Sequence, residues 1–165
     1  MTRLVLLATV LILAIFSVLL LRGNPAVSQP IAFNHLLHTD EVGADCVDCH
    51  QYAKSGVIAT IPNIAVCADC HEEAQTESAE ELRVVEFIQK GTLIPWRKIY
   101  RVPDHVYFSH RRHTQLAEIE CETCHGSVGA RTEPVVQPLV QQSMGWCIDC
   151  HERSSVTKDC VSCHV

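Results

Sequence analysis

The hydropathy pattern divides the chain into an apolar N-terminal run and a more polar remainder. Eighteen residues follow one another from Leu4 to Leu21, and only Thr9 and Ser17 interrupt the apolar side chains. As a helix this run would be about 27 Å long, which is close to the hydrocarbon thickness of a bilayer. We therefore predict a transmembrane anchor over residues 1–22.

A cleaved signal peptide is the alternative interpretation of the same run. The apolar region of a signal peptide usually has about 7–15 residues, which is shorter than the run found here. Ala26–Ser28 offers only an imperfect cleavage site. Arg3 and Arg22 flank the run equally, so the positive-inside rule gives no orientation.

Beyond the anchor, amphipathic periodicity is almost absent. Residues 23–32 contain two prolines and predict a linker. A helix is predicted near 79–90, because Ser78 and Glu81 have the spacing of a capping box and Gly91 suits the position after the last turn. The apolar positions of this helix are predicted to form one stripe: Leu82, Val85 and Phe87 or Ile88.

A five-residue pattern, C-x-x-C-H, occurs five times in this polar part. It is the attachment signature of c-type haem, in which two thiols add to the porphyrin vinyl groups and the next residue offers a ring nitrogen to the iron. Structural zinc and a redox disulfide are the alternatives, but neither needs a histidine after every second cysteine. The residues predicted to hold five haems covalently are Cys46, Cys49, Cys67, Cys70, Cys121, Cys124, Cys147, Cys150, Cys160 and Cys163.

A second pattern, F-x-H-x-x-H, precedes the first and the third of these motifs. It begins at Phe33 and again at Phe108, and in both copies the next motif follows at the same distance, which identifies an internal repeat. We therefore divide the predicted haem domain, 33–165, into units 33–75 and 105–165, joined by the predicted helix. Histidines three positions apart share one helical face, so each pair can reach two neighbouring irons.

The number of histidines matches the number of ligands that five irons need. Five are predicted to be proximal ligands: His50, His71, His125, His151 and His164. The other five are predicted to be distal ligands: His35, His38, His105, His110 and His113. Met144 is the alternative ligand for one iron, and it would raise the potential of that haem. With two protein ligands on every iron no position is open, so no catalytic residue is predicted.

The haems must also supply the core. About 135 residues remain for five haems, roughly 27 for each, which is too few to bury an ordinary hydrophobic core. The predicted fold is therefore mostly irregular and α-helical, with little regular secondary structure and a haem-filled interior. The net charge of −6 and the lack of a basic patch exclude nucleic acid as a partner.

The unit F-x-H-x-x-H followed by C-x-x-C-H resembles the class III multihaem cytochromes c. The resemblance implies that the first histidine of each pair, His35 or His110, faces the haem of the motif that follows it. It also implies that His113 serves the last motif. His38 and His105 then serve the other two haems, in an order that the resemblance does not assign.

A longer resemblance rests on three stretches, Ile94–His113, Cys121–Gly126 and Met144–His151. They are similar to the pentahaem subunit of alternative complex III, a bacterial quinol:electron-acceptor oxidoreductase. This implies docking on an iron–sulfur and molybdopterin-fold subunit and on integral membrane quinol-binding subunits, with a monohaem cytochrome or terminal oxidase downstream. Menaquinone reductase complexes use similar multihaem subunits, which leaves the direction of electron flow open.

These patterns together predict a membrane-anchored pentahaem cytochrome c that relays electrons and is not itself an enzyme. Its haem domain is expected on the periplasmic side of the cytoplasmic membrane, because haem is attached to such motifs outside that membrane. Two alternatives stay open. One is a self-sufficient membrane multihaem quinol dehydrogenase, and the other is a free periplasmic electron carrier.

Overall fold

The computed structural model describes residues 11–12, 16–17 and 26–164. Most of the predicted anchor, Leu4–Leu21, lies outside these described residues. Within the described ranges, no helix has the length and apolar character needed to cross a membrane.

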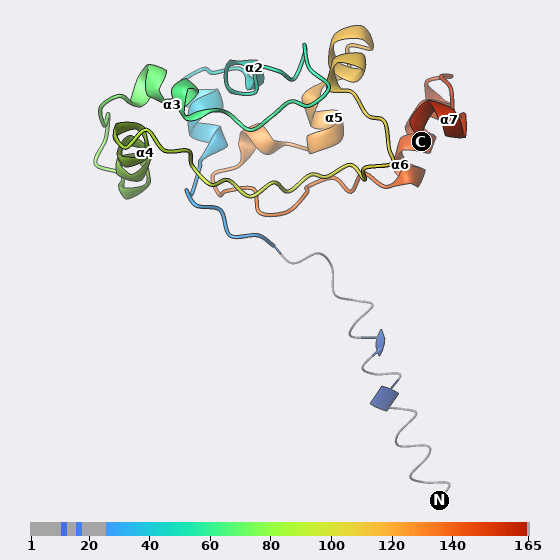
Figure 1. Cartoon of the computed structure of the whole chain (residues 1–165), viewed down its shortest axis with the longest axis horizontal. Helices are drawn as coiled ribbons and strands as arrows, with labels where there is room; N and C mark the ends of the chain where they lie inside the picture. The colour runs from blue at the N-terminus through green and yellow to red at the C-terminus, as the bar shows by residue number, and fades with distance from the viewer. Residues whose placement is uncertain (1–10, 13–15, 18–25, 165) are drawn as a thin grey trace, which may run out of the picture.

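Short helices joined by irregular segments make up the described part of the chain (Figure 1). In chain order they are the π-helical turn η1 (Leu37–Glu41), α2 (Cys46–Cys49), α3 (Ile64–His71), α4 (Ala79–Gln89), the π-helical turn η2 (Arg112–Leu116), α5 (Cys121–His125), the 3-10 turn η3 (Val128–Ala130), α6 (Met144–Arg153) and α7 (Cys160–Cys163). The extended pairing seen among the described residues is a single antiparallel bridge between Val106 and His164. The prediction of little regular structure is confirmed.

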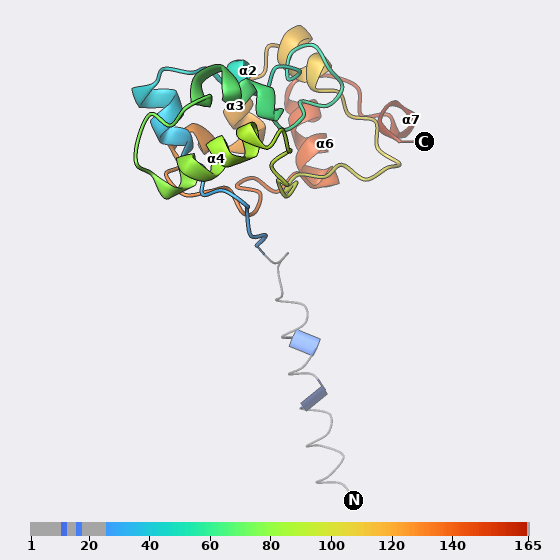
Figure 2. The ribbon, with the colours of Figure 1, turned by 60° about the vertical axis from the view of Figure 1, so that its left-hand side comes forward.

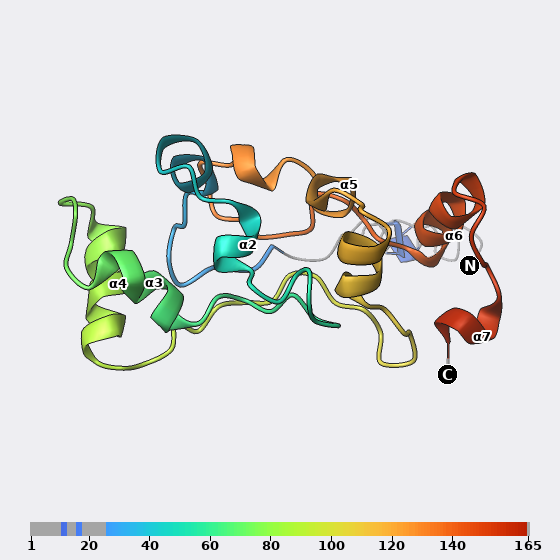
Figure 3. The same ribbon diagram turned by 90° about the horizontal axis from the view of Figure 1, so that it is seen from above.

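The helices that carry the C-x-x-C-H motifs follow one another along the long axis of the molecule. Figures 1 and 3 show α3 at one end, then α2, then α5, with α6 and α7 together at the other end. Helix α4 lies beside α3, and Figure 2 shows this pair at the front of the domain. The spatial order therefore differs from the chain order at the first two motifs.

The internal repeat is visible in the backbone as well as in the sequence. The interval from η1 to η2 equals the interval from Phe33 to Phe108, and each turn begins shortly after the first histidine of its pair. Such π-turns contain an extra residue per turn and are frequent at functional sites. Both copies of the pattern thus adopt the same unusual local conformation.

The two units also exchange equivalent hydrogen bonds. The amide of Leu36 donates to the carbonyl of Arg131 at 3.0 Å, and the amide of Arg111 donates to the carbonyl of Gly56 at 2.9 Å. The two donors occupy equivalent positions of the repeat, and so do the two acceptors, which makes the contacts reciprocal. Each histidine pair is therefore held in part by the loop that follows the first motif of the other unit.

The polypeptide by itself has almost no hydrophobic core. Among the described residues, the buried apolar side chains are Ile31, Ala53, Val85 and Ile94. Four such residues are far too few for a domain of this size, because folding depends on removing apolar surface from water. The short helices must pack against something other than protein side chains.

Helix α4 confirms the predicted helix near 79–90, and Gly91 ends it with a φ of 61°, which favours glycine. The predicted capping box is wrong. Ser78 makes no side-chain cap hydrogen bond, and the Glu81 carboxylate turns away to the loop before the helix. The apolar stripe is confirmed at Val85, whereas Leu82 is 50% exposed.

The C-terminal part of the predicted linker packs against the domain. Gln29 donates to the carbonyls of Arg97 and Val135, and it accepts from the amide of Arg97. Ile31 is only 2% exposed. Residues 26–31 are therefore attached to the second unit and to the segment that joins the two units.

Candidate functional site

Each motif lies on a short helix, and the helix explains why its three chemical groups work together. In an α-helix, positions i, i+3 and i+4 share one face. In α2 the amide of His50 donates to the carbonyl of Cys46 at 2.8 Å, and in α7 the amide of His164 donates to Cys160 at 2.8 Å. Both thiols and the imidazole of a motif are thus presented together.

Side-chain hydrogen bonds start three of these helices, and at α2 the Asp48 carboxylate accepts from the amide of Asp45 at 2.7 Å. Asn63 accepts a hydrogen bond from the amide of Ala65 at the start of α3, and Ser143 accepts one from Trp146 at the start of α6. Such caps satisfy amides that the first turn leaves unpaired. No two of the ten cysteines are joined by a disulfide in the described structure.

The thiols of neighbouring motifs lie close enough to influence one another. Burial raises the pKa of the Cys67 thiol, and Cys49 of the first motif raises it further. Burial also raises the pKa of Cys46, with Cys121 of the third motif as the next cause. The first motif therefore lies between the second and the third.

The same relation extends to the other end of the molecule. Burial raises the pKa of Cys124, and the next cause is Cys150 of the fourth motif. Burial raises the pKa of Cys147, and the next cause is Cys163 of the fifth motif. The five motifs form one continuous series, α3, α2, α5, α6, α7, in agreement with Figures 1 and 3.

Each predicted distal histidine approaches a histidine of one motif. The ring centroids are 6.2 Å apart for His38 and His71, 6.2 Å for His113 and His151, 6.3 Å for His110 and His125, and 5.5 Å for His105 and His164. Metal–imidazole bonds of about 2.0–2.1 Å on opposite sides of one ion place two ring centres about 6.2–6.4 Å apart. Three of these pairs match that spacing, and the fourth is slightly closer.

After these four pairs, His35 is the remaining predicted distal histidine and His50 is the remaining motif histidine. Burial lowers the pKa of His35 to about 4, and the nearby His50 is the next cause. The Nδ1 atom of His35 is buried and has no protein partner among the described residues. A buried neutral imidazole keeps a nitrogen lone pair, which is the form that binds metal.

The pairs correct one assignment that the class III resemblance implies. His113 lies beside His151 of the fourth motif, and not beside His164 of the fifth. His105 takes the place beside His164, because the bridge between Val106 and His164 holds the two segments together. His38 lies beside His71 of the second motif.

Six of the ten imidazoles have an acceptor for Nδ1, which leaves Nε2 available. The acceptors are the backbone carbonyls of Asn34 for His38, Thr60 for His50, Val57 for His110, Ser109 for His113 and Thr157 for His151, and the Glu81 carboxylate for His71. Metal-binding histidines typically donate their second N–H in this way, which fixes the ring orientation and the tautomer. These contacts suit histidines that bind metal through Nε2.

A phenylalanine ring supports the second histidine of each pair. Phe33 stacks on His38 with centroids 4.4 Å apart, and Phe108 stacks on His113 at 4.7 Å. The repeated pattern contained this phenylalanine, but the pattern alone assigned it no role. The presence of a phenylalanine at the same position of both copies was the sequence feature that could have indicated this role.

Met144 lies at the first position of α6 and is 63% exposed. The five histidine pairs leave no motif histidine without a second histidine. In the described ranges, no group of three or more His, Cys, Asp or Glu side chains is arranged to hold a bare metal ion.

These observations fit haem. The chain places paired thiols beside paired histidines, and it lacks the protein core that would otherwise fill the interior. Flat apolar porphyrin faces would supply the buried surface that the described side chains do not provide. The residues that would hold each group are one motif and its paired distal histidine.

The Glu81 carboxylate is the acidic group most strongly bound within the site. Hydrogen bonds from the Thr76 hydroxyl and from the Gln75 amide lower its pKa to about 2, with smaller effects of the Thr76 amide and His71. Glu81 is therefore ionised across the neutral range. Its spacing from Ser78 predicted a capping box and gave no sign of its contact with His71.

Two known families match different parts of the chain. Residues 21–92 match the Class III cytochrome C family, and residues 106–165 match the family described as cytochrome c7 and related cytochrome c. Each match includes essentially one repeat unit.

A curated relative is the "Menaquinone reductase, multiheme cytochrome c subunit" of Nitratidesulfovibrio vulgaris (strain Hildenborough). It is 36% identical, over 59% of this chain and 51% of the relative. The chain thus spans about half the length of the curated relative it matches. Together the comparisons support a multihaem cytochrome c with covalently bound c-type haem, as the class III resemblance implied. The specific likeness to alternative complex III stays a prediction.

Proposed function

We propose that this chain binds five c-type haems in a linear series and relays electrons within a quinone-linked membrane complex. The observation that carries the proposal is the pairing of four motif histidines with four distal histidines, which leaves one histidine of each kind for the fifth site. A site with two histidines on the iron has no open position for a substrate, so the series suits electron transfer and not substrate chemistry. Haem supplies one-electron oxidation and reduction at its iron.

The chain contributes position and electrostatics. The ten thiols would fix each haem covalently, and the histidine pairs would fix its iron. The Nδ1 acceptors hold five of the rings through neutral carbonyls and one through a carboxylate. The order α3, α2, α5, α6, α7 gives electrons one path between two ends of the domain.

The partners are proposed from resemblance. The curated relative is named as a subunit of a menaquinone reductase, which supports a role inside a complex. We propose docking on an iron–sulfur and molybdopterin-fold subunit and on integral membrane quinol-binding subunits, with a monohaem cytochrome or terminal oxidase as the further partner. An alternative complex III-like quinol oxidation is one direction of flow, and menaquinone reduction is the other.

The location is part of the same proposal. The apolar run Leu4–Leu21 has the length of a membrane-spanning helix. We propose that it anchors the haem domain on the periplasmic side of the cytoplasmic membrane. An intact chain mass that begins at Met1 supports the anchor, whereas a chain that begins near Gln29 supports a free periplasmic carrier.

Purification of the full chain in mild detergent, followed by mass spectrometry and EPR, tests the proposal. We expect five haem masses per chain, signals of low-spin iron only, and co-purifying membrane partners. Fewer than five haems, or a high-spin signal, would contradict the proposed ligand set. A lone chain that oxidises a quinol analogue would favour the self-sufficient quinol dehydrogenase.

A matched variant addresses the remaining ligand alternative. Met144→Leu should leave every midpoint potential unchanged, because no iron depends on this thioether. A fall in the potential of one haem would show that Met144 binds iron, since replacing a methionine ligand lowers the potential.

A further inference from the structure

One motif histidine differs from all the other imidazoles whose Nδ1 contact is defined. His71 Nδ1 lies 2.8 Å from Oε1 of Glu81, a carboxylate. The acceptors of His38, His50, His110, His113 and His151 are backbone carbonyls. The second motif is therefore the place where a charged group touches a predicted iron ligand.

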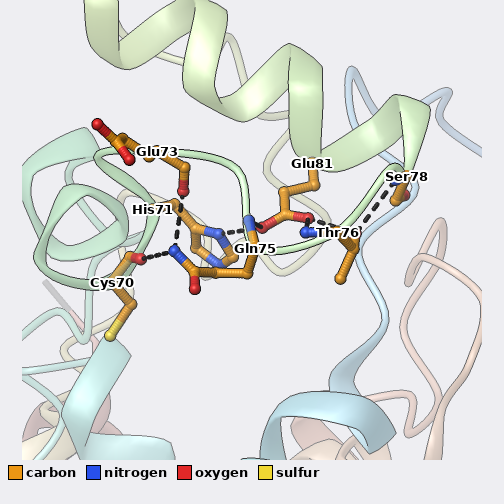
Figure 4. A network of polar contacts seen from close by, with 7 residues as sticks. All are labelled: Cys70, His71, Glu73, Gln75, Thr76, Ser78 and Glu81. Carbon is orange, nitrogen blue, oxygen red and sulfur yellow. Dashed lines mark hydrogen bonds and ion pairs between the residues drawn. The ribbon is translucent and has the colours of Figure 1, made fainter.

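Glu81 is held firmly in this position. Oε1 also accepts from the amide of Gln75 at 2.8 Å, and Oε2 accepts from the amide of Thr76 at 2.8 Å and from the Thr76 hydroxyl (Figure 4). The Glu81 side chain is only 10% exposed. Both carboxylate oxygens are thus fully used, and the contact with His71 is pre-organised.

The loop that presents these donors is itself fastened to the motif. Gln75 Nε2 donates to the carbonyl of Glu73 at 3.1 Å and lies 3.5 Å from the carbonyl of Cys70 (Figure 4). Glu81 comes from the first turn of α4, where negative charge is also favoured by the helix dipole. Two separate elements therefore position one carboxylate against His71.

We propose that Glu81 is a positioning residue that lowers the reduction potential of the haem held by Cys67 and Cys70. The inference rests on the proposed haem sites. A carboxylate that accepts the Nδ1–H of His71 increases the basicity of the ring as a ligand. A nearby negative charge with little exposure to water also stabilises the iron state with the higher positive charge. Both effects favour oxidised iron.

The location of α3 gives the effect a direction. α3 is at one end of the series, opposite α6 and α7 (Figure 3). A lowered potential at this end makes it less favourable for an electron to rest there, which favours electron transfer from α3 toward α2 compared with the same site without Glu81.

Glu81→Gln in the full, haem-loaded chain tests the inference by spectroelectrochemical titration. We expect about a tenfold loss in the preference of one site for oxidised iron, which is a rise of about 59 mV for a one-electron couple. The other midpoint potentials should stay in place. The matched control is Glu86→Gln on the same helix, whose side chain is 60% exposed and pairs with Lys90, and it should leave all potentials unchanged.

Glu81→Asp guards against misfolding of the first variant. It keeps the charge but shortens the side chain, so it should raise the same potential by a smaller amount. Unchanged potentials in both Glu81 variants, or an equal rise in Glu86→Gln, would overturn the inference. The haem mass of each chain separates these outcomes from failure of the proposed function, which would show fewer than five haems in the unmodified protein.

Discussion

The second haem site of one repeat unit and its counterpart in the other share a distal side and differ on the proximal side. His38 and His113 each stack on a phenylalanine, each donate to the carbonyl four residues before them, and each lie 6.2 Å from a motif histidine. The motif histidines, however, have different partners. His71 contacts a carboxylate, whereas His151 contacts the backbone carbonyl of Thr157 at 2.7 Å.

The difference shows which part of a repeat is free to diverge. The distal histidine lies inside the repeated pattern, where helix, π-turn and reciprocal contacts fix it. The proximal side depends on the segment after the motif, and only the first unit continues into α4. The site of His71 thereby gains a charged neighbour while the distance between its two histidines is kept. The proposed haem potential can therefore change without a change in the geometry of the histidine pair.

The largest expected effect comes from replacing the cysteines that would attach a haem covalently. Cys147→Ala with Cys150→Ala, and Cys67→Ala with Cys70→Ala, should each lose one haem. The first variant removes a site between α5 and α7, so the haem at α7 should equilibrate much more slowly with the rest. The second removes only the end site. Intact mass and the rate of reduction of each haem are the measurements, and equal slowing in both variants would contradict the linear order.

A smaller change exchanges the distal ligand. His38→Met and His113→Met should each keep all haems attached and raise the potential of one haem, because a thioether ligand favours reduced iron. A rise on the order of 0.1–0.2 V is expected, within the range of about 0.8 V that axial ligands span. Glu81 contacts the motif histidine paired with His38 and not the one paired with His113. The haem changed by His38→Met should therefore have a lower potential than the haem changed by His113→Met. Redox titration of the two variants measures both values, and identical values would contradict the comparison.

Much of the site could be predicted from the sequence, because covalent haem attachment uses a fixed local spacing. The five motifs, the five additional histidines and the repeat that begins at Phe33 and Phe108 were all visible without a structure. Which distal histidine serves which motif was not visible. His105 lies beside His164 only because residues far apart in the chain form a bridge at Val106, and spacing carries no such information.

Glu81 shows how a correct local pattern can give a wrong contact. Ser78 and Glu81 have the spacing of a capping box, and α4 does begin where the pattern predicted. The carboxylate instead takes four donors from the preceding loop and from His71, which together outweigh one amide at the cap. A tertiary contact replaced a local one, and sequence spacing describes only the local choice.

The smallest expected effect comes from two hydrogen bonds between the repeat units, one beside each histidine pair. The hydroxyl of Thr39 lies 2.9 Å from the carbonyl of Gly129, and the hydroxyl of Thr114 lies 2.7 Å from the carbonyl of Ala53. Thr39→Val and Thr114→Val keep the shape but remove these bonds between units, at a cost of about 0.5–1.5 kcal/mol each in the free energy of unfolding. Denaturant unfolding of the haem-loaded chain measures the loss, with haem potentials as the control.

Thr39→Val and Thr114→Val should lose nearly the same free energy of unfolding, because both hydroxyls join a histidine pair to the loop of the opposite unit. The potentials should not move in either variant, since neither hydroxyl contacts an imidazole nitrogen in the described structure. A clear difference between the two losses would mean that the units are not equivalent even on the distal side. The difference between the units at Glu81 would then be one part of a wider difference between them. Equal losses of unfolding free energy would instead mean that the units differ at the motif histidine and not on the distal side.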